Sequence, residues 1–131
     1  MKIILLSGRP SSGKSTALNL LYDKLMESGK CSVISEKTPR DSFDFECVLS
    51  CNNKTVAIYT FGDVYQWCVE AIVKYANCDV LVLAYSNKFA RSLEKIVSNN
   101  KKYHQIIKKQ RATDSDNEKV CAEILAQIQR K

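Results

Sequence analysis

A glycine-containing motif near the N-terminus, Gly-x-x-x-x-Gly-Lys-Ser over residues 8–15, carries the clearest chemistry in the chain. Glycines at this spacing let the backbone turn so tightly that successive N–H groups point into one concavity, which suits phosphate oxygens. The ammonium of Lys14 can then reach the β- and γ-phosphates of a nucleotide, and the hydroxyl of Ser15 can coordinate Mg²⁺. The motif therefore predicts a site for a nucleoside triphosphate with Mg²⁺.

The motif also has the sequence context that such a loop requires. An apolar run, Ile3 to Leu6, precedes it, and apolar residues at helical spacing follow it. This is the Walker A pattern, and on these residues the chain resembles the P-loop NTPase superfamily, as a small ATPase or kinase-like member. The resemblance implies triphosphate binding on a parallel α/β sheet. The residues it assigns to nucleotide binding are Gly8, Arg9, Pro10, Ser11, Ser12, Gly13, Lys14, Ser15 and Thr16.

The acidic residues can be sorted by their position along the predicted strands. In an open parallel α/β sheet, ligands bind beyond the carboxyl ends of the strands. Asp79 opens its strand and lies at the wrong end, whereas Asp63 and Glu36 each stand just past a carboxyl end. Asp41 and Asp44 belong to a loop that could fold over the phosphates. Asp63 and Glu36 are therefore the acids we consider for the site.

Asp63 is the best candidate for an acidic partner of Mg²⁺ beside Ser15, acting directly or through a water. The alternative is a helix N-cap, because a helix is predicted directly after it. In the usual Walker B arrangement an Asp ends the apolar strand, but Tyr59 or Thr60 occupies that position here, which argues against an ordinary GTPase. The segment 86–89, Ser-Asn-Lys-Phe, also lacks the Asp of a guanine-reading motif, so we expect ATP.

Other charged residues have weaker assignments. Glu36 could be a base or a metal ligand, because acids at this strand end have these roles in nucleotide kinases. The alternative is a surface acid. Arg40, Arg91 and Arg111 could each stabilise transferring phosphate or be surface charges. Arg111 follows the last predicted strand, where P-loop folds often pack the nucleotide base, and we count it as cofactor-binding. The candidate catalytic residues are Lys14, Asp63 and Glu36.

Strand and helix patterns alternate along the chain and would position these residues. Strands are predicted near residues 2–7, 31–36, 45–50, 55–60, 79–84 and 103–108, and helices after residue 16 and near 64–75, 89–97 and 115–128. The expected fold is α/β: one domain, residues 1–131, forming a three-layer αβα sandwich of the P-loop NTPase type. Its sheet would have five or six strands, mostly parallel, with one antiparallel edge strand from a hairpin at residues 51–54.

Composition narrows the class of protein. With 45% apolar and 26% charged residues, the chain is ordinary for a globular domain. No stretch approaches a membrane span or a signal peptide. The net charge of +6 is explained by lysines on solvated surfaces. Lysines that flank a strand also explain the basic cluster over residues 101–111, so nucleic-acid binding is not favoured. Six cysteines without a Cys-x-x-Cys pair do not suggest zinc; we expect buried free thiols and a reducing, cytoplasmic setting.

These observations favour an ATP-binding, Mg²⁺-dependent ATPase acting on the γ-phosphate. One alternative is a nucleotide or small-molecule kinase, although its only lid-like segment, residues 87–95, has the pattern of an amphipathic helix. The other is a nucleotide-binding switch or assembly module with little turnover, completed by a protein partner or by self-association.

Overall fold

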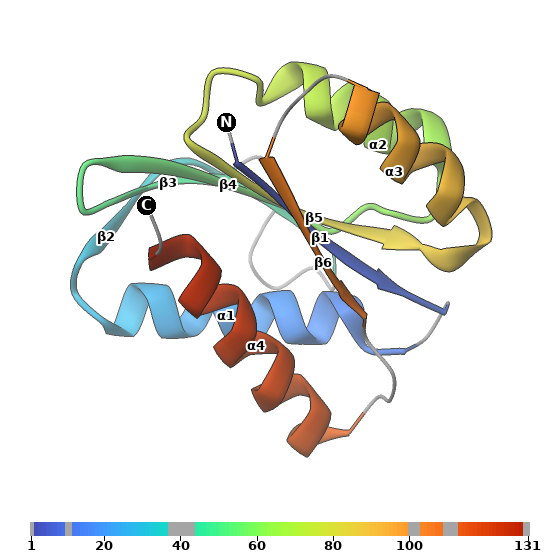
Figure 1. Ribbon diagram of the computed structural model, residues 1–131. Helices are drawn as coiled ribbons and strands as arrows, with labels where there is room; N and C mark the ends of the chain where they lie inside the picture. Colours follow the sequence, from blue (N-terminus) through green and yellow to red (C-terminus); the bar gives the residue numbers. More distant parts are fainter. Residues whose placement is uncertain (1, 10–11, 37–43, 100–102, 109–112, 130–131) are drawn as a thin grey trace.

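The computed structural model describes residues 2–9, 12–36, 44–99, 103–108 and 113–129. Within these segments a single sheet is covered by helices on both faces, with α1 and α4 on one side and α2 and α3 on the other (Figure 1). The elements are β1 (Lys2–Gly8), α1 (Lys14–Glu27), β2 (Cys31–Glu36), β3 (Glu46–Cys51), β4 (Lys54–Tyr59), α2 (Tyr65–Lys74), β5 (Val80–Ser86), the 3₁₀ helix η1 (Asn87–Phe89), α3 (Ala90–Asn99), β6 (Tyr103–Lys108) and α4 (Asp114–Gln129).

The strands follow the order β2-β3-β4-β5-β1-β6 across the sheet. β1 is parallel to both β5 and β6, and β4 is parallel to β5. β3 is antiparallel to β2 on one side and to β4 on the other. β1 and β5 are buried on both faces, which explains why their sequences are continuous apolar runs without alternation.

The predicted sheet is wrong: this is a mixed sheet, not a mostly parallel P-loop NTPase sandwich with an antiparallel strand at one edge. β3 lies inside the sheet, so both pairings in the β2-β3-β4 half are antiparallel. The physical reason lies in the connections. The β3–β4 turn contains Asn52 and Asn53, both with positive φ, as a two-residue hairpin requires, and no described helix separates β2 from β3 or β3 from β4.

Two apolar clusters hold the helices on the sheet. The cluster under α1 and α4 includes Ile4, Leu18 and Ile124, and the cluster under α2 and α3 includes Leu5, Ile72 and Leu93. Adjacent residues of β1 thus point to opposite faces. The glycine loop is therefore attached to a strand fixed from both sides.

The cysteines differ in part from the prediction. Cys31 and Cys51 form a disulfide between β2 and β3, so the expectation of free thiols is wrong for this pair. Cys47, Cys68 and Cys121 are free and buried, and Cys78 is free and partly buried. None of the described helices is long and apolar enough to cross a membrane.

Candidate functional site

The glycine motif connects β1 to α1 at the carboxyl end of β1, an interior strand between β5 and β6. Gly13 caps α1 in the left-handed conformation, with φ 89°, which a residue with a side chain rarely adopts. The turn before it is closed by a hydrogen bond of 3.1 Å from Ser12 N to Arg9 O. Arg9 and Thr16 are exposed, and Pro10 and Ser11 lie outside the described residues.

Lys14 is buried at the first position of α1, with 8% of its surface exposed. Its Nζ donates to the carbonyl oxygens of Gly8 at 3.1 Å and Arg9 at 2.9 Å. Burial lowers the pKa of Lys14, while the charges of Asp63 and Asp44 act in the opposite direction. The lysine and both carboxylates therefore occupy one electrostatic environment at this end of the sheet.

Asp44 contacts the motif directly, although sequence reasoning placed it only in a nearby loop. Its Oδ1 accepts hydrogen bonds from Ser15 Oγ at 2.6 Å and from Thr60 Oγ1 at 3.0 Å. The next residue, Phe45, is fully buried, packs edge-on against Tyr22 of α1, and donates its N–H to Thr60 Oγ1 at 2.9 Å. The buried Phe45 therefore fixes the preceding residue, Asp44, between the glycine motif and the end of β4.

The topology shows what signal could have identified Asp44. β3 is antiparallel to β4, so the start of β3 lies beside the end of β4, where Glu46 pairs with Tyr59. A residue just before β3 therefore reaches the carboxyl end of the sheet. The signal in the sequence is the hairpin predicted at residues 51–54, because a residue just before the first strand of a hairpin lies beside the end of the second strand.

Ser12, one of the predicted nucleotide-binding residues, has a buried hydroxyl. It is 7% exposed, and its Oγ is one of the buried side-chain atoms without a hydrogen-bond partner among the described residues. A buried hydroxyl without a partner is costly unless some group completes it. Its position in the turn before Lys14 suits an acceptor such as a phosphate oxygen.

Asp63 is exposed in the connection between β4 and α2. The interpretation of Asp63 as a helix N-cap is wrong, because α2 begins at Tyr65 and its N-cap is Val64, without a side-chain cap hydrogen bond. The neighbouring Gly62 lies so close to β5 that an added Cβ would be 1.8 Å from Ala84 O. This contact fixes the connection that carries Asp63, whose role at the site stays a prediction.

The other predicted site residues are spread more widely. Glu36 ends β2 at the sheet edge, with β3, β4 and β5 between it and β1. Arg91 is exposed on α3, whereas Arg40, Asp41 and Arg111 lie outside the described residues. Asp79, which sequence reasoning discarded, does lie at the opposite end, directly before β5, and accepts from Thr55 N at 2.8 Å.

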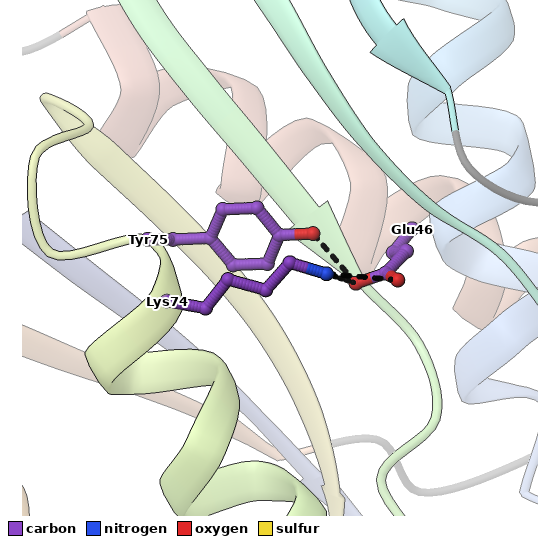
Figure 2. Close-up of polar contacts among 3 residues, drawn as sticks. All are labelled: Glu46, Lys74 and Tyr75. Carbon is purple, nitrogen blue, oxygen red and sulfur yellow. Dashed lines mark hydrogen bonds and ion pairs between the residues drawn. The ribbon is translucent and has the colours of Figure 1, made fainter.

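A polar cluster on the α2 side of the sheet was also missed. Figure 2 shows Tyr75 and Lys74 converging on Glu46: Tyr75 Oη donates at 2.6 Å, and Lys74 Nζ is 3.2 Å from each carboxylate oxygen. Burial, followed by the contact with Glu46, raises the pKa of Tyr75. The cluster attaches the end of α2 to β3, which is a structural role.

No family model, curated protein or solved structure matches this chain. The described residues contain no group of three or more His, Cys, Asp or Glu side chains arranged to hold a metal ion. A Mg²⁺ site of one or two protein oxygens completed by phosphates and water does not need such a group. The lack of such a group among the described residues therefore does not bear on Mg²⁺ binding at the glycine motif.

Proposed function

We propose that this protein binds ATP together with Mg²⁺ at residues 8–16 and hydrolyses the γ-phosphate. The observation that carries the proposal is the convergence of Lys14, Ser15 and Asp44 around the glycine motif. A buried ammonium and a hydroxyl held by a carboxylate are the groups that a triphosphate and a divalent cation require.

Several features of the loop support triphosphate binding. Lys14 Nζ now contacts only neutral carbonyl oxygens among its described hydrogen-bond acceptors, at 3.1 and 2.9 Å. Phosphate oxygens would be stronger acceptors because they are charged. Ser12 Oγ lacks a partner in the same turn. The N-terminus of α1 adds a partial positive charge.

Ser15 and Asp44 fit a Mg²⁺ ion. Neighbouring ligands of an octahedral Mg²⁺ with bonds of 2.0–2.1 Å are about 2.9 Å apart. Ser15 Oγ and Asp44 Oδ1 are 2.6 Å apart, so a small separation would let both oxygens face one ion. Thr60 would keep the carboxylate oriented. When bound, the ion neutralises negative charge on the phosphate oxygens.

The residues would contribute mainly positioning and electrostatic stabilisation, which are the main demands of phosphoryl transfer. Lys14 would stabilise charge on the β- and γ-oxygens, and Asp63 would orient the attacking water. A kinase receives less support, because Phe89 and Leu93 of the lid-like segment pack against the core. A switch with little turnover is the second candidate, because Asp44 is already engaged by Ser15 and Thr60 and Asp63 is exposed.

A panel of ATP, GTP and CTP, each with and without Mg²⁺, would test the proposal through the melting temperature and phosphate release. We expect the largest stabilisation with ATP and Mg²⁺, because a ligand that binds only the folded state raises its stability. Lys14→Ala should abolish the stabilisation. Lys30→Ala should keep it, because Lys30 is exposed and lies directly before β2, at the opposite end of the sheet.

The outcomes separate the candidates. Stabilisation with phosphate release supports the ATPase. Stabilisation without release, in the presence or absence of small-molecule acceptors, supports the switch. If no triphosphate raises the melting temperature of the unmodified protein, the proposal is wrong.

A further inference from the structure

The Cys31–Cys51 disulfide lies at the end of the sheet opposite the glycine motif. Cys31 opens β2, Cys51 ends β3, and the two residues are directly opposite each other in the antiparallel ladder. Their exposure differs: Cys51 is 6% exposed, whereas Cys31 is only partly buried. Of the two cysteines, Cys31 is therefore the more exposed residue, and we expect an incoming nucleophile to attack it first.

A cavity of about 530 Å³ opens onto this disulfide. Besides both cysteines, its wall contains the apolar side chains of Leu25, Leu125 and Ile128. This volume falls within the range of small-molecule sites, about 300–1,000 Å³. The disulfide therefore faces a space that a small molecule can enter.

The wall of the cavity is positively charged. Lys24, Lys30 and Lys54 line it, and no Asp or Glu is among its described lining residues. Lys24 pairs with Glu118 at 3.0 Å and Lys54 acts on the carboxylate of Asp79, so part of both charges is offset. Lys54 Nζ also donates to Ile128 O at 3.4 Å, and Lys30 is exposed. The cavity thus favours ligands that carry negative charge.

We propose that Cys31–Cys51 is a thiol–disulfide exchange site for small anionic thiols, which enter through this lysine-lined cavity. In the first step the thiolate of the small molecule attacks Sγ of Cys31 and forms a mixed disulfide. The Cys31–Cys51 bond breaks, and Cys51 leaves as a thiolate that takes a proton from solvent.

In the second step another thiolate attacks the sulfur of the small molecule in the mixed disulfide. Cys31 is released as a thiol after protonation, and the small molecule leaves as its own disulfide. Two electrons pass from two small thiols to the protein, and the reverse sequence reoxidises the pair. The hydrogen bonds between β2 and β3 do not depend on the disulfide, so we expect the reduced protein to stay folded.

The first experiment counts thiols by mass spectrometry after alkylation of the denatured protein, purified without reductant. We expect labelling of the four free cysteines, Cys47, Cys68, Cys78 and Cys121, and of all six after reduction. Labelling of all six without reductant would overturn the proposal.

The second experiment compares rates of reduction by glutathione, which is anionic, and cysteamine, which is cationic. Each rate is divided by the rate of the same thiol on bis(2-hydroxyethyl) disulfide, which removes intrinsic reactivity. At low ionic strength the protein should favour glutathione, since one unit charge about 10 Å away changes such a rate about twofold in water. Lys30→Gln should reduce the preference about twofold or more, and 0.5 M NaCl should largely remove it.

Lys88→Gln is the matched control, because this exposed lysine lies after β5, at the other end of the sheet. It should keep the preference for glutathione. With glutathione disulfide, Cys51→Ser should form an adduct on Cys31 faster than Cys31→Ser forms one on Cys51. Equal preference for both thiols, or equal loss in Lys30→Gln and Lys88→Gln, would contradict the proposed role of the cavity.

Discussion

Substitution of Asp44 by Asn tests the candidate Mg²⁺ site most directly. The carboxylate accepts two hydrogen bonds, from Ser15 Oγ at 2.6 Å and Thr60 Oγ1 at 3.0 Å. Asn has nearly the same shape and keeps one carbonyl acceptor, but it removes the negative charge. We therefore expect Asp44→Asn to fold and to lose most of the Mg²⁺-dependent part of ATP binding.

The size of this effect follows from metal-site energetics. Loss of a group that binds or orients a metal ligand typically lowers affinity about 10–100-fold, which equals about 1.4–2.7 kcal/mol. Through linkage, the same free energy is lost from the stabilisation by saturating ATP and Mg²⁺. For a chain of this size each kcal/mol shifts the melting temperature by about 3–5 °C. The increment from ATP and Mg²⁺ should therefore fall by about 4–13 °C.

The assay is the melting temperature with and without ATP and Mg²⁺, compared as a difference within each variant. This difference removes the destabilisation of the ligand-free protein that the lost charge causes by itself. Asp79→Asn is the matched control: its carboxylate accepts two hydrogen bonds from Thr55, at 2.8 and 3.2 Å, at the opposite end of the sheet. If ATP and Mg²⁺ raise the melting temperature of Asp44→Asn as much as that of the unmodified protein, but no longer raise that of Asp63→Asn, then Asp63 holds the metal and the assignment to Asp44 is wrong.

Three further predictions concern the frame around the site. Tyr75→Phe removes the 2.6 Å hydrogen bond to Glu46 and should lower the unfolding free energy in urea by about 1.5–3 kcal/mol; an unchanged midpoint would contradict this. Gly62→Ala places a Cβ against Ala84 O and should cost about 1–3 kcal/mol in the same assay, whereas a neutral effect would show that the connection moves easily. Burial, with a smaller effect of Glu46, raises the pKa of Tyr59 from 10.0 to about 12, so the folded state favours the neutral phenol. The stabilisation that Tyr59 contributes to the folded state in this way is complete below pH 10 and is lost as pH rises from 10 to 12. In Tyr59→Phe, the unfolding free energy in urea should therefore fall less steeply over this pH range.

The sequence predicted local elements well where a single period or motif determines them. The apolar run before the glycine motif is β1, and the last expected strand, residues 103–108, coincides with β6. Helical spacing after residue 16 correctly predicted α1, although the helix begins earlier, at Lys14. These signals depend on neighbours within a few residues, because burial on both faces or on one helix stripe leaves a direct mark on the sequence.

The features that the sequence missed depend on residues far apart in the chain. The interior position of β3 follows from its pairing with both β2 and β4, which no periodicity encodes. Ser15 and Asp44 are 29 residues apart and meet only because β3 starts beside the end of β4. Cys31 and Cys51 are likewise joined across 20 residues, a pairing that requires the strand register.

The mixed sheet and the missing acid at the end of β4 have a common explanation. In the usual Walker B arrangement the Asp ends the strand itself. Here Thr60 stands after β4 in its place, and the acid is Asp44, which lies just before β3 and accepts a hydrogen bond from the Thr60 hydroxyl. A parallel neighbour would place its first residues at the opposite end of the sheet, whereas antiparallel β3 delivers Asp44 to Ser15. The proposed metal site therefore requires the antiparallel direction of β3, which is also what makes the sheet mixed. Thr60, at the end of β4, then donates a hydrogen bond to the acid that the adjacent strand supplies.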